Sequence, residues 1–229
     1  MVSLGIGRQT NITIMQPEQY DDWYRMPRGR WIGETEYRLL RNILRPQVGE
    51  SLLDVGCGTG YFARRFAEDG KLAVTGIDPN SEWLAYAAAH ACMQENFVEA
   101  NALALPFPDH VFDVSISITA LCFVSEQRKA LAEILRVTRR RFAIGLLNRH
   151  SLLYWQKGRH GGSGAYSGAH WHSAAEIRQL FSGFPVRDLI IHSAVFMPQG
   201  GKLSQLIEGF LPSTLLCGSF ILVAGEVMC

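Results

Sequence analysis

The stretch Leu52-Leu53-Asp54-Val55-Gly56-Cys57-Gly58-Thr59-Gly60 decides the fold class of this chain. An apolar run typical of a buried strand leads directly into closely spaced glycines, and a helical pattern begins after them. Glycine tolerates positive φ and carries no Cβ, so a ligand can approach bare backbone at the carboxyl end of the strand, beside a helix N-terminus. The stretch therefore predicts a ligand-binding turn between a strand and a helix.

The spacing of these glycines argues against two common phosphate-binding loops. A dinucleotide fingerprint needs G-x-G-x-x-G, and Tyr61 stands where the third glycine would be. No G-x-x-x-x-G-K-[ST] pattern is present either, which excludes a P-loop. An acid follows at the end of the next predicted strand, where Asp78 can accept hydrogen bonds from both ribose hydroxyls of a nucleoside. The alternative is that Asp78 only caps the following helix.

Short apolar runs alternate with helical patterns on both sides of the turn. Predicted strands cover 51–55, 72–77, 96–100, 111–118, 142–147, 186–196 and 220–227. Predicted helices cover 18–24, 34–44, 61–68, 81–90, 126–138 and 173–181, and the Gly/Ser-rich segment 158–168 is typical of a flexible loop. This alternation predicts a doubly wound α/β fold with a mostly parallel sheet, whose last two strands form an antiparallel edge.

Composition narrows the class of protein further. With 229 residues, 48% hydrophobic and 19% charged, the chain is expected to form one globular domain. A net charge of +1 argues against a nucleic-acid partner. The longest apolar runs are far shorter than the roughly 20 residues of a membrane span. The five scattered cysteines and the absence of signal-peptide features over residues 1–15 predict a cytoplasmic protein.

Two motifs carry a resemblance to a known family. The glycine stretch from Asp54 to Gly60 resembles the first motif of class I S-adenosylmethionine-dependent methyltransferases. The run Asn101-Ala102-Leu103-Ala104-Leu105-Pro106-Phe107-Pro108-Asp109, followed by Phe112-Asp113-Val114, resembles the type 11 or ubiquinone-biosynthesis-like branch. The similarity extends from about Tyr20 to Phe184.

The resemblance implies a seven-stranded Rossmann-like methyltransferase fold in a single domain. Residues 1–45 would form an N-terminal helical lid, 46–150 the cofactor-binding core, and 151–229 the acceptor-side loop and the C-terminal part of the sheet. S-adenosylmethionine would be the cofactor and S-adenosylhomocysteine the product. The protein would transfer the methyl group to a small-molecule acceptor by in-line displacement.

The same resemblance assigns cofactor-binding roles along the predicted strand ends. Gly56, Cys57, Gly58 and Gly60 would line the methionine half of the cofactor, and Asp54 would face its amino group. Asp78 would hold the ribose, while Pro79 and Asn80 flank the adenine. Asn101 replaces the usual Asp that accepts from the adenine amine, and Ala102 would offer its backbone N–H. Ile118 and Thr119 would lie beside the sulfonium, with Tyr20 closing over the methionine end.

The segment after the fifth predicted strand holds the candidates for a catalytic base. The candidates are His150, His160, Tyr166, His170 and His172, with Tyr154 and Trp155 in the same segment. Loops at the carboxyl ends of strands form the ligand crevice of such sheets, which favours His170 first, with Tyr166 and His172 as further candidates. The alternative is a simple lead-in to a helix capped by Ser173 and Glu176. No metal site is predicted, because no Cys or carboxylate stands at ligand spacing beside these histidines.

Several alternatives stay open from the sequence. The acceptor and the atom methylated are undetermined, and the chain could be a monomer or a homodimer. A cofactor-binding regulatory or partner protein without transferase activity would carry the same glycines and the same Asp78. A nicotinamide-dependent oxidoreductase is disfavoured by Tyr61 alone.

Overall fold

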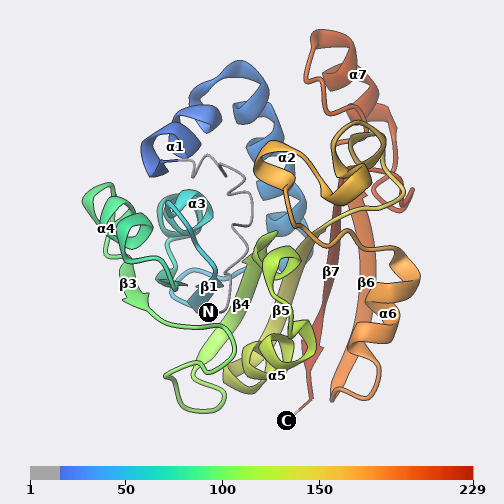
Figure 1. The fold of residues 1–229 in the computed structure, drawn as a ribbon. Coiled ribbons are helices and arrows are strands. Elements are labelled where there is room, and N and C mark those ends of the chain that lie inside the picture. Colours follow the sequence, from blue (N-terminus) through green and yellow to red (C-terminus); the bar gives the residue numbers. More distant parts are fainter. Residues whose placement is uncertain (1–15, 229) are drawn as a thin grey trace, which may run out of the picture.

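A computed structural model describes residues 16–228 of the chain. At its centre lies a seven-stranded sheet with strand order β3-β2-β1-β4-β5-β7-β6 (Figure 1). The strands are β1 (Ser51–Val55), β2 (Ala73–Asp78), β3 (Asn96–Glu99), β4 (Phe112–Ile118), β5 (Thr138–Leu147), β6 (Val186–Ala194) and β7 (Phe220–Val227). The pairs among β1 to β5 are parallel, whereas β7 pairs antiparallel with both β5 and β6.

Helices connect the strands and cover both faces of the sheet. They are α1 (Pro17–Arg25), α2 (Pro27–Leu44), α3 (Tyr61–Gly70), α4 (Ser81–Ala89), α5 (Gln127–Val137), α6 (Ala174–Phe181) and α7 (Lys202–Phe210). Short helical turns follow β4 and β5, namely η1 (Ala120–Phe123), η2 (Tyr154–Gly158), η3 (Arg159–Gly161) and η4 (Gly164–Tyr166).

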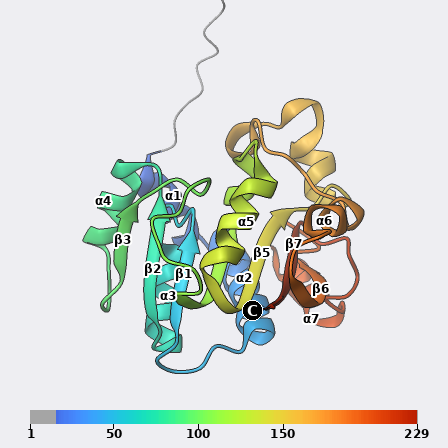
Figure 2. The same ribbon diagram turned by 90° about the horizontal axis from the view of Figure 1, so that it is seen from below.

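The alternating side chains of the strands divide the core into two layers. Leu52 of β1 packs with α2 and α3 on one face, and Leu53 and Val55 pack with α5 and α6 on the other. Both faces of a mostly parallel sheet are thereby buried, as its nearly continuous apolar strands require. Figure 2 shows the sheet between these layers of helices.

The predicted fold class is confirmed, with two refinements. The antiparallel strand is β7, which lies inside the sheet, while the edge position is taken by β6. The helix α7 was not predicted, because its apolar residues lie in a stretch flanked by glycines and prolines. The segment read as a flexible loop contains the turns η3 and η4, while residues 1–15 and Cys229 lie outside the described part of the chain.

An ion pair attaches the N-terminal helix to the glycine turn. Arg64 of α3 donates to Asp21 of α1 at 2.6 Å and to the carbonyl oxygen of Thr59 at 2.5 Å. The side chains of Asp21 and Arg64 are only 8% and 15% exposed. This interaction holds α1, with Tyr20 and Tyr24, over the carboxyl end of β1.

We expect Asp21→Asn to loosen α1 and to lower the free energy of unfolding by about 1–2 kcal/mol, because a largely buried guanidinium loses its counter-charge. Urea unfolding and limited proteolysis within α1 measure the effect. The matched control is Asp22→Asn, whose partner Arg25 is 61% exposed and whose pair should contribute less than ~1 kcal/mol. Equal stability of the two variants would contradict this role for Asp21.

Candidate functional site

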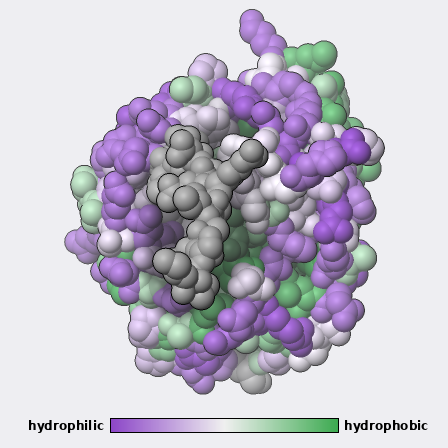
Figure 3. All heavy atoms as spheres, viewed as in Figure 1, coloured by the Kyte–Doolittle hydropathy of each residue, from purple (hydrophilic) through white to green (hydrophobic). Residues whose placement is uncertain are grey.

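A cavity of about 480 Å³ opens at the carboxyl ends of β1, β2 and β4. The glycine turn forms its floor, and the loops after β2, β3 and β4 form its sides. Figure 3 shows the molecule from the same side as Figure 1, with polar residues over most of its outline and a recessed area of apolar atoms near its centre. We refer to this cavity as the crevice.

The glycine turn holds its shape through backbone hydrogen bonds to β2. The N–H groups of Gly56 and Cys57 both donate to the carbonyl oxygen of Ile77, at 2.8 and 2.9 Å. Gly56 has φ +75°, and a Cβ at this position would lie 2.3 Å from Cβ of Ala120. Only glycine therefore allows the end of β1 to approach the start of η1 this closely.

Asp78 links the end of β2 to the same turn. One of its carboxylate oxygens accepts from the N–H of Gly58 at 3.1 Å, and the other accepts from the N–H of Asn80 at 2.9 Å. The helix after it is capped by Asn80, which accepts from the N–H groups of Glu82 and Trp83. Asp78 is thus not the helix cap, and each of its oxygens keeps a lone pair for a ligand hydroxyl.

Asp54 is the buried charge of the crevice, with only 2% of its surface exposed. Burial, and then the nearby charge of Asp78, raise the pKa of Asp54 to about 7. A hydrogen bond from the backbone of Ala63 acts in the opposite direction. Because burial disfavours the charged carboxylate, a ligand ammonium placed beside Asp54 would stabilise its ionised form in place of solvent.

The crevice brings together nearly all the residues predicted to bind a cofactor. These are Tyr20, Asp54, Gly56, Cys57, Gly58, Asp78, Pro79, Asn80, Asn101, Ala102, Ile118 and Thr119. Burial raises the pKa of the Cys57 thiol far above its usual range, so it stays protonated. Thr119 has φ +60°, a strained conformation for a threonine and one that recurs at functional sites.

One predicted contact needs correction, and another has a competing protein partner. Gly60 does not line the crevice but ends the turn as the residue before α3, and a Cβ there would lie 3.2 Å from both Ala87 and Phe97. A glycine at this position therefore allows α4 and β3 to pack closely against the turn. The side-chain oxygen of Asn101 already accepts from the N–H of Leu103 at 2.9 Å, so only its second lone pair is left for an adenine amine.

Of the aromatic side chains that line the crevice, Tyr20 was predicted from the sequence, whereas Trp83, Tyr24 and Tyr61 were missed. The ring of Trp83 lies 5.1 Å from that of Tyr20, and a Cβ on Gly58 would sit 3.2 Å from it. Tyr24 stacks on Tyr61 with ring centroids 3.7 Å apart. Aromatic residues are frequent in the sequence at 20–24 and 61–62, which could have indicated an aromatic wall. The sequence does not show which of these rings face the crevice.

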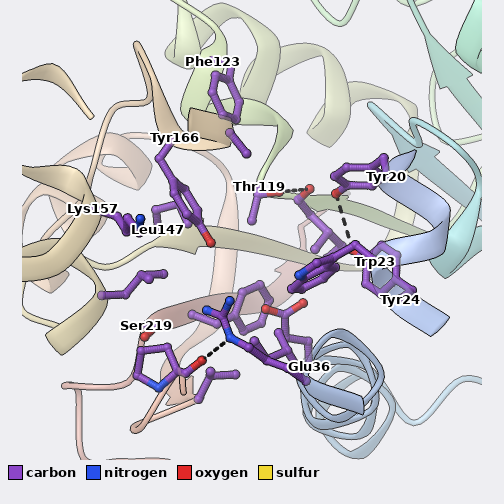
Figure 4. Close-up of a pocket in the computed structure, with 18 residues that line it drawn as sticks. Tyr20, Trp23, Tyr24, Glu36, Thr119, Phe123, Leu147, Lys157, Tyr166 and Ser219 are labelled. Carbon is purple, nitrogen blue, oxygen red and sulfur yellow. Dashed lines mark hydrogen bonds between the residues drawn. The ribbon is translucent and has the colours of Figure 1, made fainter. Parts of the chain in front are cut away.

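A second cavity of about 280 Å³ adjoins the first. The two share the lining residues Tyr20, Tyr24, Ile118, Thr119, Phe123 and Ala165. Figure 4 shows this second cavity, with Tyr166 reaching into it from one side and Glu36 from another. We refer to it as the inner cavity. Tyr166 is the one member of the predicted catalytic group that lies here.

The structure does not bring His170 and His172 to either cavity. They line a separate depression with residues of α5 and α6, including Gln127 and Glu176. The His172 backbone N–H pairs with the carbonyl oxygen of Leu147, and its Nε2 lies 3.0 Å from the side-chain oxygen of Gln127. Burial lowers the pKa of His172 to about 4. The prediction that these histidines supply the base is corrected on these grounds.

The side chain of Ser173 accepts from the backbone N–H of Glu176, and the side chain of Glu176 accepts from the backbone N–H of Ser173. The capping box of the alternative interpretation is therefore present. Among residues 16–228, no group of three or more His, Cys, Asp or Glu side chains is arranged to hold a metal ion. Across the same residues, no helix combines the length and the apolar character needed to cross a membrane.

The crevice fits a nucleoside that carries an amino acid tail. Asp78 and the bare turn at Gly56 and Gly58 suit a ribose and its neighbouring backbone contacts, and Trp83 supplies an aromatic wall. Asp54 offers a counter-charge for an ammonium group. The inner cavity adjoins the crevice at Ile118 and Thr119.

Comparisons with known proteins agree with this geometry. Residues 53–142 match the family described as a methyltransferase domain. An uncharacterized methyltransferase of Mycobacterium marinum is 42% identical over 93 residues, 40% of this chain and 36% of the relative. An O-methyltransferase of Pyrenophora dematioidea is 35% identical over 103 residues, 43% of this chain and 39% of the relative. The matches therefore span less than half the length of these curated relatives.

Solved structures show the same fold. A methyltransferase of Thermotoga maritima, described as a possible histamine N-methyltransferase, superposes with a TM-score of 0.72 at 21% identity, covering 92% of this chain and 96% of that one. The segment that matches the methyltransferase domain, residues 53–142, carries both the glycine turn and Asp78, and together with the shared fold it supports a class I S-adenosylmethionine-dependent methyltransferase.

Proposed function

We propose that the protein transfers the methyl group of S-adenosylmethionine to a small, largely apolar acceptor bound in the inner cavity. The observation that carries this proposal is the junction of the two cavities at Ile118 and Thr119. A cofactor seated in the crevice with its adenosine at Asp78 would direct its sulfonium end toward this junction. The acceptor would reach the methyl group without passing through solvent.

In this proposal the protein acts by alignment and by exclusion of water. The cofactor supplies an electrophilic methyl group on a positively charged sulfur. Asp54 would hold the ammonium group of the cofactor and Asp78 its ribose. Because Gly56 and Gly58 carry no side chain, the cofactor could lie directly against the backbone of the turn. Tyr20 and Tyr24 on α1 would cover the junction as a lid, so that acceptor and methyl meet in a fixed, dry geometry.

The test is a pair of measurements on the same preparation. Calorimetry with S-adenosylhomocysteine should show binding, and incubation with S-adenosylmethionine and a panel of phenols, amines and aliphatic alcohols should release S-adenosylhomocysteine with at least one acceptor. Binding without any transfer would favour a regulatory or partner protein. No binding at all would overturn the proposal.

We expect the affinity for S-adenosylhomocysteine to rise about tenfold from pH 6 to pH 8. Below its pKa of about 7 the Asp54 carboxyl is neutral and cannot pair with the ligand ammonium, and above it the carboxylate is ready to do so. Calorimetry across this pH range measures the change. The variant Asp54→Asn should bind weakly at every pH, with a flat profile.

Methylthioadenosine provides the matched ligand control, because it keeps the adenosine and the sulfur but lacks the amino acid tail and therefore the ammonium group. Its affinity should change little over the same pH range. If methylthioadenosine shows the same rise as S-adenosylhomocysteine, the titrating group is not Asp54 facing an ammonium, and Asp78 becomes the candidate.

A further inference from the structure

The walls of the inner cavity are mostly aromatic and aliphatic. Tyr20, Trp23, Tyr24, Phe123, Tyr166 and Phe220 contribute rings. Three side chains that can carry charge also line it, namely Glu36, Arg28 and Lys157. Such a cavity suits a flat apolar molecule with one polar group, because the rings provide contact area and the few polar side chains orient the ligand.

Glu36 is unusual because it lies on the buried stripe of α2. Gly29, Ile32, Gly33 and Leu40 mark this stripe, and Glu36 stands between Ile32 and Leu40 at helical spacing. Among the described residues it makes no ion pair or side-chain hydrogen bond. Burial alone raises the pKa of its carboxyl to about 8. The side chain of Glu36 is half-buried and lines the inner cavity, so its carboxyl is open to a ligand there and is a candidate for a functional group.

The other two charges indicate what that ligand is. Arg28, whose Nε donates to the carbonyl oxygen of Pro198 at 2.6 Å, comes from the same helix. Lys157 comes from η2, on the side of the cavity formed by the segment after β5. Two cations in a small apolar cavity disfavour a positively charged acceptor such as an ammonium ion, and they would stabilise negative charge that develops on an acceptor oxygen.

We propose that the acceptor is an aromatic hydroxyl compound and that Glu36 is the base that takes its proton. The inference rests on the proposed transferase function. In the step, the phenol O–H bond breaks and its proton passes to the Glu36 carboxylate, while the oxygen forms a bond to the methyl carbon. The carbon–sulfur bond breaks and its electron pair stays on sulfur, leaving a neutral thioether, an aryl methyl ether and a protonated Glu36.

The pKa values of a phenol and of Glu36 are close enough for proton transfer between them. A phenol has a pKa of about 10, close enough to that of Glu36 for proton transfer during methyl transfer, whereas an aliphatic alcohol is far weaker as an acid. The ionisable groups that face Glu36 include cations and tyrosines from α1, α2, α3, η2 and η4. They are Arg28, Lys157, Tyr20, Tyr24, Tyr61 and Tyr166. The tyrosines stay neutral near pH 8, because burial raises the pKa of each.

The test compares the full-length wild-type protein with Glu36→Gln on two phenols of similar shape. One is the best phenol of the acceptor panel, and the other is its nitro-substituted counterpart, which is already ionised at the assay pH. We expect kcat/KM of Glu36→Gln to fall about 100-fold with the ordinary phenol and to change less than about threefold with the nitrophenol. A purely structural role for Glu36 would lower both equally.

Two further readouts complete the design. With saturating S-adenosylmethionine, so that the pH dependence of cofactor binding at Asp54 does not contribute, the kcat/KM of the wild-type protein with the ordinary phenol should rise with pH up to about 8, and this rise should be absent in Glu36→Gln. Affinity for S-adenosylhomocysteine should be unchanged. Glu34→Gln is the matched control on the same helix, since Glu34 pairs with Arg65 outside the cavity and its loss should leave activity unaltered.

The outcomes separate this inference from the proposed function. Equal losses on both phenols, or no loss on either, would overturn the role of Glu36. Methylation of amines or aliphatic alcohols but of no phenol would overturn the acceptor class while the transferase function stands. Binding of S-adenosylhomocysteine without turnover of any acceptor would refute both.

Discussion

Gly56→Val should abolish detectable binding of S-adenosylhomocysteine, with a loss of affinity greater than about 100-fold. The residue has φ +75°, where a β-branched side chain is strongly disfavoured, and the added Cβ would meet Cβ of Ala120 at 2.3 Å. Relief of this clash requires the end of β1 and the start of η1 to move apart. Both segments line the crevice, so the movement reshapes the surface that the cofactor contacts. Calorimetry measures the loss, and far-ultraviolet circular dichroism confirms that the sheet remains.

Gly49→Val is the control for backbone strain. Gly49 also has positive φ, at +84°, but no described atom lies within 4 Å of its Cβ position, and it precedes β1 at the opposite end of the strand. This variant should lose stability and keep its affinity for S-adenosylhomocysteine. Retention of binding in Gly56→Val, or comparable loss in both variants, would show that the close approach to Ala120 does not shape the crevice.

The crevice was predictable because its parts are local in sequence. A strand, a turn and a helix follow one another within residues 51–70, and Asp78 ends the neighbouring parallel strand, so the register of a parallel sheet brings them to one edge. Gly60 was assigned to the ligand because glycine spacing does not distinguish a residue that faces a cofactor from one that faces a helix. Only the packing of Ala87 and Phe97 makes that distinction.

The inner cavity was not predictable for the opposite reason. Its walls come from α1, α2, η2, η4 and the segments around β6 and β7, which lie far apart in the sequence. Glu36 was passed over because the helix was predicted to begin at Glu34, which hid the stripe formed by Gly29, Ile32 and Gly33. The histidines drew attention by composition, yet the bridge between Asn148 and His172 turns that segment toward α5.

Asp78→Ala should weaken the binding of S-adenosylhomocysteine by about 1.5–3 kcal/mol, or roughly 10- to 150-fold. Two effects add in the same direction. The ribose would lose a charged acceptor for its hydroxyls, and the N–H groups of Gly58 and Asn80 would lose the carboxylate that fixes them. Burial raises the pKa of Asp78, so the carboxylate is already short of solvent and its ligand contacts count more than those of an exposed acid. Calorimetry at pH 8, where Asp54 is ionised, gives the value.

Asp113→Ala is the matched control because Asp113 plays the same structural part at the other end of the sheet. Its carboxylate accepts from the backbone N–H and the hydroxyl of Ser51, at 3.0 and 2.9 Å, and so ties β4 to the start of β1. Its removal should lower stability without changing cofactor affinity. If Asp78→Ala were less stable but bound S-adenosylhomocysteine as the wild type does, the role of Asp78 would be structural, linking β2 to the glycine turn. The nucleoside would then have to be held by the aromatic walls at Trp83 and Tyr20.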